Sequence, residues 1–212
     1  MNYRGVQPLQ FLLCLVALQL VACQPHTDRS APVAAQAARE DLVPLVRPLP
    51  TEPADAPLVV EFDLEPPSGN ASPTLFIGIR VNRTLDEQAA TALSSAGRNG
   101  LQAAVVMRRL QASGAAGVPL NQMEMLPGGG GSYVPASADG RVSGGWAADA
   151  DTLSLEAAGL ATRGEQYAQL ALAAARDLSP GRYQLSVRLL APLPTLQPYR
   201  PELLVAYSRR PK

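Results

Sequence analysis

The sequence predicts one mainly-β, sandwich-like domain, because three stretches carry an apolar residue at every second position. These stretches are residues 58–64, 74–81 and 182–189. Such alternation is typical of strands that bury one face and expose the other. The length of 212 residues suits one domain with appendages. Because only 5% of the residues are aromatic, Leu, Val, Ile and Ala must build most of the core.

The first two strands are predicted at residues 58–64 and 74–81. Every second residue from Leu58 to Leu64 is apolar, whereas Glu61 and Asp63 lie on the opposite face. We expect that opposite face to be exposed to solvent, since charged side chains rarely lie in a core without a partner.

A short helix is predicted after the second strand. Thr84 and Glu87 have the spacing of a capping box, which begins a helix. One face of this helix carries Leu85, Ala89, Leu93 and Ala96. Gly97 is typical of a helix end. A further strand is predicted at residues 101–110.

Residues 112–145 are rich in glycine. Pro127–Gly131 lacks the Gly-Lys-Ser/Thr ending of a phosphate-binding loop, so a flexible loop is expected there. Asp139-Gly140 is a tight-turn pair. This pair could join residues 133–134 to residues 141–142.

The strand at 182–189 is preceded by a turn signal. Pro180 and Gly181 suit the two central positions of a type II turn. With Tyr183 included, the stretch Leu178–Tyr183 resembles the corner of immunoglobulin-like sandwiches. In that corner, a tyrosine at the start of a late strand bonds back to the preceding turn. The resemblance implies an immunoglobulin-like antiparallel β-sandwich with one short helix inserted.

The segment Gln166–Asp177 has two interpretations. Its alanines favour a helix, whereas its place before the corner favours a strand with Leu170, Leu172 and Ala174 inward. We choose the strand, because the sandwich needs a partner there, and the helix stays open as the alternative. Residues 202–208 are predicted as the closing strand.

The N-terminus has the pattern of an export signal. Arg4 and the amino terminus precede the apolar run Phe11–Leu18, which is shorter than the roughly 20 residues of a membrane-spanning helix. The following Leu20-Val21-Ala22-Cys23 resembles the lipobox of bacterial lipoproteins. The resemblance implies that a diacylglyceryl group is added to the Cys23 thiol. Cleavage between Ala22 and Cys23 and acylation of the new amine would follow.

Lipidation of Cys23 would attach the protein to a membrane and would also indicate its location in the cell. One acyl chain alone holds a protein to a membrane only weakly, since each buried methylene contributes about 0.8 kcal/mol. An ordinary thiol after a plain signal peptide is the alternative for Cys23. In the lipoprotein family an aspartate after the cysteine favours the inner membrane, and this chain has Gln24. We therefore expect the bacterial cell envelope, at the periplasmic face of the outer membrane.

Three parts follow from these patterns: a signal peptide at 1–22, a lipidated Cys with a Pro/Ala-rich tether at 23–56, and the sandwich domain at 57–212. The tether contains Pro25, Pro32, Pro44, Pro48, Pro50 and Pro53. Proline removes backbone donors and favours extended conformations. At about 3.1 Å per residue, the tether could reach on the order of 100 Å.

Several classes of catalytic site are excluded from the predicted domain. Cys14 would leave with the signal, Cys23 would be lipidated, and His26, the only histidine, lies in the tether. The domain therefore cannot build a Ser-His-Asp triad or a His/Cys zinc site. Asp149 and Asp151 lack the glycine and distal glutamate of a calcium loop. We predict no enzyme, no metal and no cofactor.

The remaining hypothesis is a binding module. Trp146, the only tryptophan, could be a binding surface or part of the core. The 18 basic and 18 acidic residues give no overall field that would attract nucleic acid. We expect a protein partner in the periplasm, for example a toxin or effector that an immunity-type protein neutralises, by analogy of plan alone. The alternative is a structural or assembly lipoprotein of an envelope complex.

Overall fold

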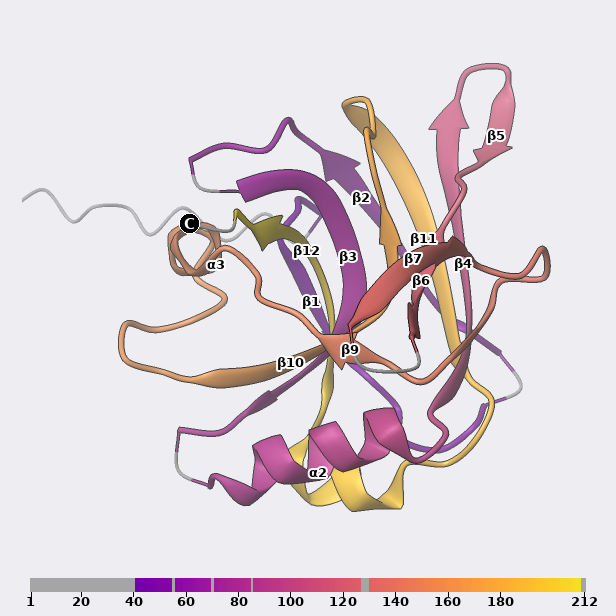
Figure 1. Cartoon of the computed structure of the whole chain (residues 1–212). Coiled ribbons are helices and arrows are strands. Elements are labelled where there is room, and N and C mark those ends of the chain that lie inside the picture. Colours follow the sequence, from indigo (N-terminus) through magenta and orange to yellow (C-terminus); the bar gives the residue numbers. More distant parts are fainter. Residues whose placement is uncertain (1–40, 55, 70, 85, 127–129, 211–212) are drawn as a thin grey trace, which may run out of the picture. The chain divides into compact units, whose positions relative to one another are not determined.

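The structure is a computed structural model that describes residues 41–54, 56–69, 71–84, 86–126 and 130–210. These residues belong to one compact unit, Ala38–Lys212. Two sheets form a sandwich (Figure 1), and all pairings between their named strands are antiparallel. The predicted β-sandwich with a short helix is confirmed.

The large sheet has the strand order β1-β12-β3-β10-β6-β7, and β9 also pairs with β10. Its strands are β1 (Leu45–Pro48), β3 (Ala71–Asn82), β6 (Asn121–Met125), β7 (Gly131–Pro135), β9 (Trp146–Ala147), β10 (Tyr167–Ala175) and β12 (Glu202–Arg209).

The small sheet has the strand order β2-β11-β4-β5, and β8 also pairs with β4. Its strands are β2 (Leu58–Leu64), β4 (Gln102–Gln111), β5 (Gly114–Gly117), β8 (Arg141–Ser143) and β11 (Gly181–Leu189). The helices of the described residues are α2 (Gln88–Arg98), α3 (Thr152–Ala157) and the 3-10 helix η1 (Pro194–Tyr199). Figure 1 shows α2 across one end of the sandwich, next to η1.

The main core lies between the two sheets, where the predicted alternation places it. On β2 the apolar set Val60, Phe62 and Leu64 is buried, while Glu61 is exposed. Tyr183 on β11 stacks on Phe62, with ring centroids 5.9 Å apart. A period of two therefore predicted correctly which face of these strands is inside.

The corner before β11 forms as its resemblance implies. Tyr183 is 1% exposed, and its hydroxyl donates a hydrogen bond to the Ser179 carbonyl at 2.6 Å. Gly181 has φ +146°, away from the roughly +80° of a type II turn. In immunoglobulin domains the last strand joins the sheet of the corner strand. Here β12 pairs with β1 and β3 in the large sheet instead.

Residues 167–175 form the strand β10, so the strand prediction for this segment is confirmed. The predicted inward set is corrected at one position. The pairing of β10 with β3 shifts between Ala171 and Ala173, and a bulge reverses the alternation beyond it. Leu170 and Leu172 therefore face the main core, whereas Ala174 faces the opposite side of the sheet.

The folded unit begins earlier than the predicted boundary at Pro57. Strand β1 pairs with β12, and Leu45 is only 2% exposed. Val43 and Leu49 are buried in the same core. The prolines did not prevent a strand, because β1 lies at the edge of the sheet, where a missing backbone donor is tolerated. At least residues 43–49 of the predicted tether are therefore part of the fold.

The described residues of the glycine-rich middle contain the strands β5, β6, β7 and β8. The Asp139-Gly140 turn forms, with φ +75° at Gly140. However, it joins β7 of the large sheet to β8 of the small sheet, so no hairpin results. A Cβ at Gly140 would lie 2.5 Å from the Val105 carbonyl, so close packing also requires glycine there.

Helix α2 buries the predicted Ala89, Leu93 and Ala96, but the capping box does not form. Glu87 makes no capping hydrogen bond and pairs with Arg83 at 3.1 Å. Thr84 instead accepts a hydrogen bond from the Gln166 backbone at 2.8 Å. A tertiary contact therefore replaces the local cap. The short helices α3 and η1 were not predicted.

Candidate functional site

The predicted anchor residues Ala22 and Cys23 lie outside the described residues, and so does His26. Lipidation of Cys23 therefore stays a prediction. Within the part of the chain that the structure describes, no helix has the length and apolar character needed to cross a membrane.

Trp146 lies on β9, which pairs with β10 through Trp146 and Ala171. Its half-buried side chain packs against a second apolar cluster on the outer face of the large sheet. This outer cluster consists of Phe76, Ala150, Leu155, Ala171, Ala174, Leu204 and Ala206. Trp146 thus packs on the fold through part of its surface and leaves the rest for other contacts.

Tyr133 and Arg176 complete a surface around Trp146. The Tyr133 ring meets Trp146 edge to face, with centroids 5.8 Å apart and planes at 86°. The Arg176 guanidinium carbon lies 4.4 Å from the centroid of the Tyr133 ring. Tyr133 is 36% exposed, and Arg176 is also exposed. We call Tyr133, Trp146 and Arg176 the aromatic surface.

The large sheet brings these three residues together from distant parts of the chain. Tyr133 comes from β7, Trp146 from β9, and Arg176 directly follows β10. Sequence reasoning singled out Trp146 alone, because no local spacing relates it to Tyr133 or Arg176. Only the pairing of β6 and β9 along the same edge of β10 places them side by side.

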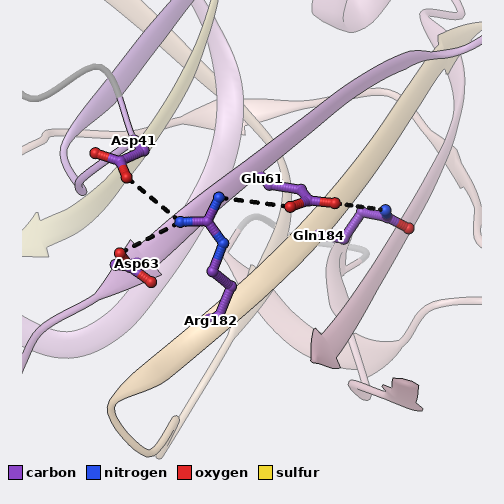
Figure 2. Close-up of polar contacts among 5 residues, drawn as sticks. All are labelled: Asp41, Glu61, Asp63, Arg182 and Gln184. Carbon is purple, nitrogen blue, oxygen red and sulfur yellow. Dashed lines mark hydrogen bonds and ion pairs between the residues drawn. The ribbon is translucent and has the colours of Figure 1, made fainter. Parts of the chain in front are cut away.

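A second polar group lies on the outer face of the small sheet (Figure 2). Arg182 Nη1 lies 3.3 Å from Asp41 Oδ2 and 3.3 Å from Asp63 Oδ2, and its Nη2 lies 3.5 Å from Glu61 Oε2. Gln184 Nε2 donates to Glu61 Oε1 at 3.2 Å. The Arg182 side chain is 41% exposed.

The ion pairs around Arg182 are explained by their role in the fold. Desolvation lowers the pKa of Arg182, but the hydrogen bond to Asp41 and the charges of Asp63 and Glu61 raise it more. Exposed ion pairs contribute little stability, typically about 0–1 kcal/mol. Because Asp41 precedes β1, the group fastens the start of the folded unit to the edge of β2.

Arg80 of β3 is the buried counterpart of Arg182. It donates from Nε to Glu202 Oε2 and from Nη1 to the Leu160 carbonyl, both at 2.8 Å. Its guanidinium carbon lies 4.2 Å from the centroid of the Tyr167 ring. All of these partners belong to the fold, so Arg80 holds the segment around Leu160 on the large sheet.

The described residues contain no group of three or more potential metal-ligating side chains. A hollow of about 280 Å³ is lined by Asp151 and Tyr207, among other residues. Asp151 caps α3 by accepting a hydrogen bond from the Ser154 backbone at 3.2 Å. The Tyr207 hydroxyl donates to the Glu65 carbonyl at 2.7 Å. The side chains of Asp151 and Tyr207 in this hollow thus bond to the fold itself.

No protein-family model, no curated protein and no solved structure matches this chain.

Proposed function

We propose that this chain is a lipid-anchored binding module of the bacterial envelope, with the aromatic surface as its protein-binding site. The observation that carries the binding role is the meeting of Tyr133, Trp146 and Arg176 at one edge of the large sheet. Trp, Tyr and Arg are the residue types most enriched at binding hot spots.

The geometry of the aromatic surface favours binding because it is already ordered. Trp146 is braced from below by the outer cluster, and the Tyr133 ring is held between Trp146 and Arg176. A partner that covers Tyr133 would bury an aromatic ring without having to order it first. Such preorganisation reduces the entropic cost of association.

The anchor rests on the match of Leu20–Cys23 to a lipobox. An immunity-type role would explain why a small binding domain is held at the periplasmic face of a membrane. Lipid anchoring would keep the neutralising protein where a delivered toxin or effector arrives.

The binding role can be tested with a photo-reactive phenylalanine analogue at position 133 of the full-length chain, in its own envelope. We expect one discrete cross-linked partner. Leu153 is the matched control, because it is 62% exposed and lies on α3 rather than on the aromatic surface. A toxin or effector in the adduct supports the immunity role, and a component of an envelope complex supports the assembly role. Equal cross-linking from both positions, or none from position 133, would refute the proposed surface.

The anchor can be tested separately with radioactive palmitate and membrane fractionation. We expect Cys23→Ser to lose the label and to leave the membrane fraction. Cys14→Ser is the control, since Cys14 precedes the proposed cleavage site and should not affect the mature protein. An unlabelled wild-type chain would contradict the proposal that the protein is a lipoprotein.

A further inference from the structure

The outer face of the small sheet is open over β2, β11 and β4. Register places Val59, Ser186 and Val106 side by side in one row across these three strands. The next row contains Glu61, Gln184 and Arg108. Both rows project from the same face, because they are two residues apart on every strand.

This face combines apolar and charged side chains that are accessible. Val59 is 50% exposed and Val106 is 36% exposed. Glu61 is exposed on one outer strand, and Arg108 is exposed on the other. Arg108 forms no ion pair with any residue of the described ranges. The arginine is therefore available for a carboxylate from another molecule.

The two rows are self-complementary about the central strand. A two-fold axis along β11 places β2 of one copy over β4 of the other. Val59 then faces Val106 of the second copy, and Glu61 faces Arg108 of the second copy. Ser186 and Gln184 lie on the axis and meet their own counterparts. Each favourable contact occurs twice, as a two-fold interface requires.

We propose that this protein forms a face-to-face homodimer through the outer face of its small sheet. Two sheets that pack in this way lie about 10 Å apart, with strands crossing at about 30°. The row beyond Glu61 does not prevent this contact. Arg182 lies on the axis there, but Asp41, Glu61 and Asp63 surround it, so the charge is already compensated.

Arg188 sets the limit of the interface on the other side. It is exposed and follows Ser186 by two residues on β11, so it also lies near the axis. The two copies of Arg188 would repel each other. Arg188→Gln is therefore expected to strengthen the dimer.

Cross-linking of the full-length chain in its own envelope tests the proposed geometry. With Ser186→Cys, the two thiols face each other across the axis. A bismaleimide that spans about 10 Å, the spacing of packed sheets, should couple them. The matched control is Ser94→Cys, since Ser94 is exposed on α2 and away from this face. The chain without either substitution reports any background from Cys14 and Cys23.

Charge exchange identifies the contact between Glu61 and Arg108. In the Ser186→Cys background, Glu61→Arg alone and Arg108→Glu alone should each reduce the cross-link several-fold, because like charges then face each other. When the two single variants are produced together with different tags, the mixed dimer should regain the cross-link. Its two contacts each pair one arginine with one glutamate.

Two results would overturn the proposal. One is a cross-link from Ser186→Cys no stronger than that from Ser94→Cys. The other is a failure of the mixed pair to recover, which would mean that the single variants acted by weakening the fold. The proposal does not depend on the aromatic surface. Tyr133→Ala in the Ser186→Cys background should leave the cross-link unchanged, so the failure of one proposal is distinguishable from that of the other.

Discussion

The outer faces of the two sheets differ in what covers them. Residues 148–161, including α3, pack over the large sheet and form the outer cluster with it. Over the small sheet no described segment packs in this way, and Val59, Glu61 and Arg108 stay exposed. The large sheet therefore has a core on both sides, whereas the small sheet has one buried face and one face that no described segment covers.

This difference is visible in the strands themselves. Residues 75–81 of β3 and residues 170–175 of β10 are buried without interruption. Strands β2 and β11 instead alternate between buried and more exposed positions. A strand with both faces covered has no polar face to mark its period, so continuous apolar runs are expected in such strands. The pattern of burial thus indicates which sheet has a face that is accessible to another molecule.

The largest expected effect comes from the strand that the sequence placed in the tether. Deletion of residues 41–56 removes β1 and the buried side chains of Val43, Leu45 and Leu49. Burial of one such side chain typically stabilises a fold by about 1.5–3 kcal/mol. We therefore expect a large fall in the urea midpoint of the domain. An unchanged midpoint would mean that β1 contributes nothing to the fold and that the tether extends to residue 56 after all.

The next effect compares the two outer faces directly. Phe76→Ala in the outer cluster should cost about 3–5 kcal/mol in the free energy of unfolding, because it leaves a cavity. At concentrations where the chain is monomeric, Val106→Ala on the open face should change it by less than about 0.5 kcal/mol. Chemical denaturation of both variants measures the contrast. Similar losses for the two substitutions would show that something covers the open face.

The two arginines sharpen the same comparison. Arg80→Met leaves the Leu160 carbonyl and Glu202 without their partner, at a cost of about 1–3 kcal/mol. Arg182→Met removes only exposed ion pairs, so it should lower the free energy of unfolding less than Arg80→Met does, and less still in high salt. Unfolding at low and high salt checks this order. A larger loss at Arg182 than at Arg80 would reverse our ranking of the two faces.

A smaller effect is expected at the corner of the small sheet. Tyr183→Phe keeps the ring against Phe62 and removes the hydrogen bond to Ser179. Such a bond contributes about 0.5–1.5 kcal/mol. Urea unfolding of this variant measures the loss in the free energy of unfolding. Tyr183→Ala should cost more, about 3–5 kcal/mol in total, because it also leaves a cavity. If Tyr183→Ala is as stable as wild type, the assigned packing of β11 is wrong.

A further effect, which appears only at alkaline pH, is destabilisation through Tyr207 of the large sheet. Burial raises the pKa of Tyr207 to about 12 from its ordinary value of 10. Between these values the unfolded chain loses the phenol proton while the folded chain keeps it, so stability falls as the pH rises. Tyr207→Phe should make the melting temperature less sensitive to pH in this range. Equal sensitivity in the variant would contradict a buried phenol at this position.

Local sequence patterns were enough to predict the elements whose evidence is local. Alternation in β2 and β11 predicted both the strands and their buried faces, because each side chain's direction depends only on its place in the strand. The turn and tyrosine of the corner likewise lie within six residues of one another. The class of the fold followed from these elements, whereas the proposed location in the envelope rests on a match of four residues that the structure does not describe.

Features that depend on distant partners could not be predicted without the three-dimensional arrangement of the strands. Pro44 and Pro48 indicated a spacer, but in the structure this segment forms β1, because it pairs with β12. The bulge that turns Ala174 outward arises in the pairing of β10 with β3, and the sequence of β10 alone does not predict it. The aromatic surface and the rows of the open face exist because separate strands pair in one register. Such pairing depends on contacts between residues far apart in the chain, and these contacts cannot be predicted from a local sequence pattern.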